Sequence, residues 1–526
     1  MKEQGYVVDK LTPTSSKNEI VWDSENNQFV LVYENGETFT GTTVDPTTDK
    51  SKMWKVYTEI PTESEYSVYL AGTNATGNVV VKGVGFDAGE NTGISTVNYT
   101  NETTTAKTVV LRTNGGVLNV NAPLDTVTHY EKADKVVITA VAGNSYHENG
   151  EVTGNIEIAS GRVEVAKSAK VESILVTGND VKVDFKDKEN ISKVMVSDTV
   201  DADKQPDVAG ADIEVSSVKI VKTYDELKST IFNYGGNIAL GADIKTSSTI
   251  QMREDLLKGS HDVVLDLNGY VYTYRPTTPV GSNPAFSVKN TINFTIEGKG
   301  TICVPEDKSA RLFDVYTGGK LTINSGSYLV PNNDISTPLL RGGYDTTKGG
   351  EVVVNGGTFL AKDVCFGLFQ GTNLIIKDGN FTSNDNFIIG TNGNTGYGDN
   401  TITITGGTFN ANIESEGYIA CGIYLANTDT LNITGGTFNI NNGVGIVIRG
   451  GKATIKNVEI NLNNSGEISN GKVGDSKARI NTSAKIVIDR FSEYPAYETI
   501  DVTAEGFTLV DANGNAVDKN GNLIAE

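Results

Sequence analysis

The clearest pattern in this chain is a short phrase of alternating apolar and polar residues that recurs between Leu321 and Ile460. After a turn, each copy ends on an aromatic or large apolar residue. The copies are LTINSGSY (321–328), VVVNGGTF (352–359), LIIKDGNF (374–381), ITITGGTF (402–409), LNITGGTF (431–438) and a degraded copy, ATIKNVEI (453–460). A period of two indicates strands, and repetition every roughly 20–50 residues indicates stacked units. The phrases therefore predict coils of strands stacked on one another.

Stacking determines which residues lie above one another inside the coil. Strands of neighbouring coils sit about 4.8 Å apart, so we expect Leu431 and Ile433 to lie over Ile402 and Ile404. The phenylalanines that end the phrases are expected to form an internal aromatic column: Phe359, Phe381, Phe409 and Phe438. The glycine pairs suit a sharp corner, because glycine adopts positive φ without a Cβ penalty. The step between copies suits a right-handed parallel β-helix with three sides, so the fold class is all-β.

A second apolar segment lies between successive phrases and is followed in most copies by a glycine or asparagine turn. These segments are 312–315, 366–369, 387–389, 423–425 and 446–448. We expect them to form another strand of each coil, with a looser third side completing it.

One segment has the pattern of a helix, TYDELKSTIFNYGG at 223–236. Thr223 can cap its amino end, with Glu226 three residues later as in a capping box, and two glycines end it. Its apolar face holds Leu227, Ile231 and Tyr234. We expect the helix to cover the first coil of the long β-helix, whose strand edges would otherwise be open. This domain is assigned to 223–526.

The chain before this helix divides into three parts by composition. Residues 66–200 carry short apolar strands that recur, in the later part, every 7–11 residues. Three such strands would make one coil, so we interpret 66–200 as a first, smaller β-solenoid, with a β-sandwich as the alternative. Residues 1–65 predict a small β-hairpin module, with strands at 21–23 and 29–33. Residues 201–222 are polar and acidic and indicate a linker.

The carboxyl-terminal segment 499–526 contains two Asn-Gly pairs, at 513–514 and 520–521. Asn-Gly is the strongest short signal for a tight hairpin turn. We therefore expect hairpins that close the far end of the long β-helix.

Charge and composition exclude several partners. The 526 residues carry a net charge of −21, which argues against nucleic acid and against anionic lipid. No stretch approaches the roughly 20 apolar residues of a membrane span. The first ten residues lack the apolar region of a signal peptide, so we expect the protein to stay inside the cell or to have lost a leader. The cysteines, Cys303, Cys365 and Cys421, fit no metal motif and are expected to be unpaired core residues.

Two resemblances bear on the biological setting. The phrase KLTPTSSKNEIVWDSENNQFVLV (10–32) resembles segments of surface proteins of Gram-positive bacteria. The phrases LDLNG (265–269) and GKGTI (298–302) resemble those of right-handed β-helix surface and adhesin-like proteins and of the wider pectate-lyase-like superfamily. This second resemblance covers about 237–490 and rests on turn and core residues. It implies the fold much more than an activity.

The resemblance raises the possibility of an enzyme that cleaves sugar chains. Such lyases need clustered aspartates for calcium, and such hydrolases need a pair of carboxylates on neighbouring coils. The phrases instead place threonine, asparagine and lysine outward, and carboxylates do not cluster there. Asn427-Thr428-Asp429 matches one element of polygalacturonase-like enzymes, but the aspartate pair and the Gly-His-Gly that accompany it are missing. We interpret it as turn chemistry and assign no catalytic residue.

The sequence does not predict a metal or cofactor site either. His129, His147 and His261 lie in separate regions, so we expect ordinary loop or surface histidines. The segment from Asp511 begins like a calcium loop but has Ala516 at the position of the obligatory glycine. We assign no metal and no cofactor, and the sequence has no calcium motif.

A binding role is better supported. Loops at one corner of the coil are expected to expose Arg341, Tyr344, Tyr397, Tyr424 and Arg449. Aromatic rings stack on sugar faces, and arginine binds carboxylates and hydroxyls. We therefore interpret these five residues as ligand-binding candidates, with loop residues that bind no ligand as the alternative.

The preferred function is a bacterial surface or adhesin-like β-helix protein that presents a rigid surface, binds glycans or host and cell-surface components, and does no catalysis. It is expected outside the cell or on its surface, with a leader or anchor absent from this chain. The alternatives are a polysaccharide lyase or glycoside hydrolase and, third, a phage tail-spike or fibre protein. The sequence leaves the oligomeric state open.

Overall fold

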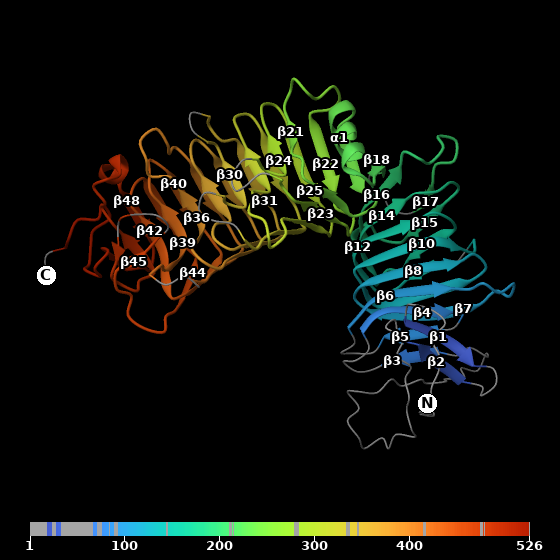
Figure 1. Cartoon of the computed structure of the whole chain (residues 1–526). Coiled ribbons are helices and arrows are strands. Elements are labelled where there is room, and N and C mark those ends of the chain that lie inside the picture. Colours follow the sequence, from blue (N-terminus) through green and yellow to red (C-terminus); the bar gives the residue numbers. More distant parts are fainter. Residues whose placement is uncertain are drawn as a thin grey trace, which may run out of the picture. The chain divides into compact units, whose positions relative to one another are not determined.

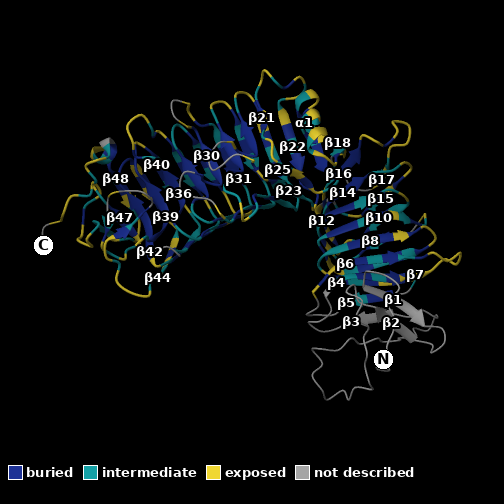
Figure 2. Ribbon diagram, in the orientation of Figure 1, coloured by how far each residue is buried: buried dark blue, intermediate teal, exposed yellow. Residues whose placement is uncertain are grey.

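The structure is a computed structural model. It describes residues 18–23, 28–32, 67–70, 76–83, 85–88, 93–143, 146–209, 213, 215–277, 283–332, 337–344, 347–413, 417–473, 477 and 479–524. The chain divides into two compact units, Met1–Lys219 and Ile220–Glu526 (Figure 1). In both units the buried residues follow the strands, whereas the connecting loops hold most of the exposed residues (Figure 2).

The second unit is a parallel β-helix whose coils contribute strands to three parallel sheets. Sheet 1 contains β19 (Gly236–Leu240), β22 (Asp262–Asp266), β25 (Asn293–Glu297), β28 (Lys320–Ile323), β31 (Glu351–Val354), β34 (Asn373–Ile376), β37 (Thr401–Ile404), β40 (Thr430–Ile433), β43 (Lys452–Ile455) and β48 (Asp501–Ala504). Sheet 2 contains β20 (Ile244–Thr246), β23 (Val271–Tyr274), β26 (Thr301–Cys303), β29 (Ser327–Val330), β32 (Thr358–Ala361), β35 (Asn380–Ser383), β38 (Thr408–Ala411), β41 (Thr437–Asn441) and β44 (Glu459–Asn463). Sheet 3 contains β21 (Ile250–Met252), β24 (Phe286–Val288), β27 (Phe313–Val315), β30 (Leu340–Gly342), β33 (Phe366–Leu368), β36 (Phe387–Thr391), β39 (Ala420–Leu425), β42 (Gly443–Ile448), β47 (Ile486–Ile488) and β49 (Leu509–Val510).

The predicted register of the repeated phrases is confirmed. Leu431 pairs with Ile402 and Ile433 with Ile404, and all four side chains are buried. Each phrase supplies two strands, because its closing aromatic residue is the first inward residue of the next strand, in sheet 2. The apolar segments between phrases form sheet 3. The expectation of a loose third side is therefore wrong, since all three sides carry strands.

The predicted aromatic column is also confirmed and extends one residue further. Its members are Tyr328, Phe359, Phe381, Phe409 and Phe438, all fully buried. Successive ring centroids lie 4.8, 4.9, 4.8 and 4.4 Å apart, and the rings are nearly parallel. At the corner before each ring stands a glycine with positive φ, as at Gly407 (+100°) and Gly436 (+105°). A side chain there would strain the backbone, which explains the repeated glycine.

The predicted helix forms as α1 (Tyr224–Asn233). The side chain of Thr223 accepts a hydrogen bond from the Glu226 amide, and the Glu226 carboxylate accepts one from the Lys222 amide. Leu227 and Ile231 are buried in the core of the second unit, next to the strands of its first coil. Tyr234 is 59% exposed, because the helix ends before it, so its predicted place on the buried face is wrong.

The first unit contains two ladders of parallel strands. One joins β3 (Ser67–Leu70), β5 (Gly85–Ala88), β7 (Thr108–Asn114), β9 (Thr126–Ala133), β11 (Tyr146–Glu148), β13 (Arg162–Val165), β15 (Lys182–Phe185) and β17 (Asp207–Ala209). The other joins β4 (Thr76–Lys82), β6 (Gly93–Thr100), β8 (Val117–Ala122), β10 (Lys135–Val141), β12 (Glu151–Ile158), β14 (Lys170–Val176), β16 (Ile191–Ser197) and β18 (Val215–Val221). Every second strand pairs, so a coil has two strands. The prediction of three strands per coil here is wrong.

Both ends of the first unit extend this stack. At the amino end β1 (Asn18–Asp23) pairs antiparallel with β2 (Gln28–Val32), as predicted, and also parallel with β4. Its turn, at residues 24–27, lies outside the described residues. At the carboxyl end, residues 201–222, which their composition indicates as a linker, contain β17 and β18 in register with the preceding coil. A short apolar pattern inside polar sequence is sufficient to continue an existing ladder.

Smaller elements complete the chain. They are the 3₁₀ helices Lys188–Asn190 and Pro495–Thr499 and the antiparallel pair β45 (Gly471–Lys472) and β46 (Arg479–Ile480). The two Asn-Gly segments form tight turns as predicted. Asp511 and Asp518 each accept hydrogen bonds from the amides two and four residues later. These bonds hold the pKa of both carboxyls below the usual range.

His129 lies in the core of the first unit, so the expectation of a loop or surface histidine is wrong for it. Its Nδ1 is 2.9 Å from the Glu148 carboxylate, and its Nε2 is 2.8 Å from the Thr113 hydroxyl. Glu148 also accepts hydrogen bonds from the Tyr146 hydroxyl and the Gly150 amide. The side chains of His129 and Glu148 are both fully buried, which a polar pair tolerates only when its groups are satisfied.

Candidate binding groove on the third sheet

The candidate site lies on the outward face of sheet 3. Inward side chains of this sheet belong to the core, and the alternate residues form an outward row along the axis. In register, this row contains Ser287, Asp314, Arg341, Gly367, Gly390, Tyr424, Val447 and Val487. Outward residues would normally be exposed, but these are buried. Pro338 lies over Gly367, and Val473 and Tyr494 pack in the cluster that holds Tyr424.

The row begins with a buried ionic network. Asp314 accepts hydrogen bonds from Arg311 Nε (2.8 Å) and from Arg341 Nη2 (2.6 Å). Tyr316 donates to Asp314 and accepts from Arg341. Burial raises the pKa of Tyr316, and the nearby Asp314 carboxylate raises it further. The Arg341 guanidinium also stacks 4.2 Å from the Tyr344 ring centre.

The row ends in a second apolar cluster outside the coil. Tyr424, Val447 and Val487 pack there against residues such as Phe387 and Val473. The two ends of the row thus differ in chemistry, one ionic and the other apolar.

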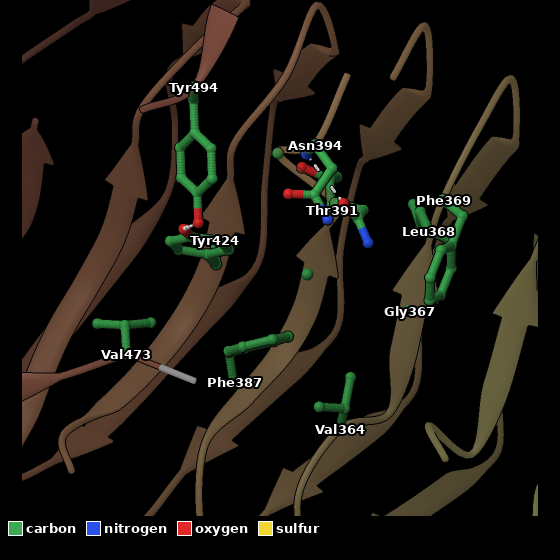
Figure 3. A pocket seen from close by; sticks show the side chains of 13 residues that line it. Val364, Gly367, Leu368, Phe369, Phe387, Thr391, Asn394, Tyr424, Val473 and Tyr494 are labelled. Carbon is green, nitrogen blue, oxygen red and sulfur yellow. Dashed lines mark hydrogen bonds between the residues drawn. The ribbon is translucent and has the colours of Figure 1, made fainter. Parts of the chain in front are cut away.

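Between these two ends lies a groove of about 250 Å³ (Figure 3). We call it the sheet-3 groove. Its floor includes Gly367 and Gly390, which occupy the same register position on β33 and β36. Neither has positive φ, so the reason for glycine is space. A Cβ at Gly367 would meet Pro338 at 2.7 Å, and one at Gly390 would overlap the Phe387 ring.

Aromatic rings form one wall of the groove. Phe387 stacks on Tyr424, with ring centres 5.6 Å apart. Tyr494 comes from the chain after β47, and its ring points toward Tyr424 (Figure 3). Tyr494 is only partly buried, and it lines the groove.

A chain of hydrogen bonds sets the polarity of this wall. Arg449 is fully buried; its Nε donates to Asp489 and its Nη1 to the Tyr424 hydroxyl, both at 2.9 Å. The Tyr424 hydroxyl in turn donates to the Tyr494 oxygen at 2.9 Å. Burial raises the pKa of Tyr424, so the phenol is neutral. Because Tyr494 accepts this bond, its own O–H proton can be donated to a ligand.

The adjoining wall is the segment Asn392–Asn394, which follows β36 and packs at Gly393 against the Tyr494 ring. The side-chain amide of Asn427 donates to the carbonyl oxygens of Asn392 and Asn394, at 2.9 and 3.0 Å. The Asn392 side chain accepts a hydrogen bond from the Asn394 amide. These bonds hold the wall in place, whereas the Asn394 side chain is exposed.

An aromatic row leads away from the groove. Phe369 lines the groove and contacts Tyr344 and Tyr397 edge to face, at 5.7 and 5.6 Å between ring centres. Tyr344 is 48% exposed.

The five residues proposed from the sequence fall around this region in different roles. Tyr424 lines the groove, and Tyr344 and Tyr397 belong to the aromatic row. Arg449 donates a hydrogen bond to the Tyr424 hydroxyl, and Arg341 belongs to the ionic network. The expectation that all five are exposed in loops is wrong for Arg341, Tyr424 and Arg449, which are at most 7% exposed. Arg341 and Tyr424 are strand residues of the covered sheet, and Arg449 follows one.

Sequence reasoning missed Phe387, Tyr494 and the glycine pair. Gly367 and Gly390 carried a usable signal, since glycine inside a strand indicates close approach of another group. Tyr494 carried none, because it lies outside the repeated phrases and meets Tyr424 only through folding.

The other motifs have structural roles. Asn427-Thr428-Asp429 follows β39 in a turn, as predicted. Asp429 is fully buried and accepts hydrogen bonds from the amide and side chain of Asn400, and burial raises its pKa. Cys365 and Cys421 are free and buried, which raises the pKa of each thiol to about 12. In the described part of the chain, no three His, Cys, Asp or Glu side chains are grouped to hold a metal ion. None of the helices in that part has the length and apolar character to cross a bilayer.

Comparison of the chain with protein-family models, with curated proteins and with solved structures finds no match. The parallel β-helix is shown by the strand pairing of the structure. Membership of the pectate-lyase-like superfamily remains a hypothesis.

Proposed function

We propose that this protein is a rigid β-helix of the bacterial surface that binds glycans through the sheet-3 groove and does not cleave them. The observation that supports binding is the groove itself, in which aromatic rings, amides and a hydroxyl converge on one hollow. Ligand sites are typically concave and apolar with a few placed polar groups. The extracellular setting rests on the resemblances to bacterial surface proteins.

The lining also supports binding over cleavage. None of the thirteen residues that line the groove is Asp, Glu, His, Lys, Arg or Cys. Hydrolysis of a glycosidic bond requires, in most enzymes, two carboxyl groups that flank it, and a lyase requires a base. Tyr424 is a poor base at neutral pH because burial raises its pKa and keeps the phenol protonated.

A glycan array combined with turnover assays tests this proposal. We expect binding to a subset of glycans, without new reducing ends and without the ultraviolet absorbance of unsaturated products. Turnover of a bound glycan would refute the non-catalytic part, and the absence of binding across the array would refute the glycan part.

A further inference from the structure

We infer that the sheet-3 groove accepts an uncharged sugar residue and discriminates against uronates, sialylated sugars and sulfated sugars. This inference rests on the proposed function and adds the ligand class and the contacts that select it.

The size of the groove suits one sugar residue of a longer chain. Its volume is about 250 Å³, below the roughly 300–1,000 Å³ of pockets that enclose drug-sized ligands. One wall ends in the exposed Asn394 and the other in the partly exposed Tyr494, so the remainder of a chain can stay outside. The remainder of such a chain can then contact Phe369 and the other rings of the aromatic row.

The charges around the groove select against anionic sugars. The Arg449 guanidinium, which contacts the lining residue Tyr424, is fully buried and already bonded to Asp489 and Tyr424. Because no Lys, Arg or His lines the groove, a sugar carboxylate there would lose water without gaining a counter-ion, which weakens its binding. The net charge of −21 adds a general repulsion of polyanions.

The polar groups match the hydroxyls of a neutral sugar. Sugar rings have apolar C–H faces and polar edges, which fit flat rings such as Tyr494 and Phe387 beside hydrogen-bonding groups. Tyr494 can donate its hydroxyl proton because its oxygen accepts from Tyr424. The exposed amide of Asn394 provides a donor and an acceptor. Because Asn427 holds the Asn392–Asn394 wall, little ordering is needed on binding.

Calorimetric titration of the full chain tests this inference. The probes are neutral hits of the glycan array, with cellotetraose and N-acetylchitotetraose included, and tetragalacturonate as the matched anion. We expect binding of neutral glycans and at least about tenfold weaker binding of tetragalacturonate, the cost of one unpaired charge.

Three variants locate the contacts. Tyr494→Phe keeps the ring and removes the hydroxyl, so affinity should fall about three- to tenfold, as for one hydrogen bond. Tyr494→Ala should weaken binding more. Gly393→Ala places a Cβ 2.6 Å from the Tyr494 ring and should weaken binding by displacing that ring. The control is Tyr234→Ala, an exposed tyrosine at the end of α1, which should bind like the parent.

Two outcomes would overturn the inference while leaving the proposed function intact. One is a preference for acidic glycans. The other is glycan binding that all three groove variants retain at parental affinity and melting temperature. Absence of binding to every glycan would instead remove the proposed function and the inference together.

Discussion

Replacing Phe409 by alanine removes one ring from the middle of the aromatic column. Phe409 is fully buried and lies 4.8 Å from Phe381 and 4.4 Å from Phe438, ring centre to ring centre. Burial of the side chain contributes about 1.5–3 kcal/mol, and each stacked pair adds about 0.5–1.5 kcal/mol. Together these give a loss of about 2.5–6 kcal/mol, which includes the range of about 3–5 kcal/mol for core Phe→Ala substitutions.

Hydrogen–deuterium exchange with mass spectrometry measures this loss locally, through the opening free energy of peptides that cover β38 and β41. Because about 1.4 kcal/mol corresponds to a factor of ten, protection in these peptides should fall by about two to four decades. Thr403→Ala, on the outward face of the same coil, is the matched control and should change protection by less than one decade.

A double-mutant cycle isolates the stacking itself. Phe409→Ala and Phe438→Ala together should cost less than the sum of the single substitutions, by about 0.5–1.5 kcal/mol. Unchanged protection in Phe409→Ala, or strictly additive substitutions, would refute the stacked column.

Two further predictions concern buried and exposed charges. His129→Ala should destabilise the first unit by about 3–5 kcal/mol, because it leaves Glu148 buried without its histidine partner. Hydrogen exchange of peptides that cover β9 and β11 measures this, and an effect no larger than that of the partly exposed control His147→Ala would contradict it. Lys320 Nζ lies 2.7 Å from Glu351 Oε1 and holds the pKa of that carboxyl below its usual value. The pair therefore stabilises the fold fully above the pKa that Glu351 has in the unfolded chain. This stabilisation is lost as the pH falls through the pKa that Glu351 has in the folded protein. Lys320→Met should raise the pKa of Glu351 in a carbon-13 NMR titration, with a stability change of only about 0.2–1 kcal/mol because the pair is partly exposed; an unchanged pKa would contradict the assignment.

The coil of the second unit could be predicted because its determinants are local. The alternation of apolar and polar residues in Leu431–Ile433 specifies a strand, and the glycine before Phe438 specifies the corner. The return of the same phrase in the next coil specifies the stacking. The first unit was harder to predict in detail. Its strands carry few apolar residues between polar corners, and that pattern does not distinguish two sides per coil from three.

The groove and the buried histidine were not predictable for a different reason. Tyr424 and Tyr494 meet across 70 residues, and His129 finds Glu148 one coil later. No local pattern connects such partners. The repeat pattern predicts Arg341 and Arg449 in exposed corner loops, but Arg341 lies on a buried strand of sheet 3 and Arg449 directly after one.

The most direct test of the central claim is a crystal structure of the full chain soaked with a neutral oligosaccharide that binds in solution. We expect density for one sugar residue in the sheet-3 groove, within hydrogen-bonding distance of the Tyr494 hydroxyl and of the Asn394 amide, with an apolar face against an aromatic ring. An oligosaccharide bound only on the outward face of sheet 1 or sheet 2, with the groove empty, would contradict the assignment of the site.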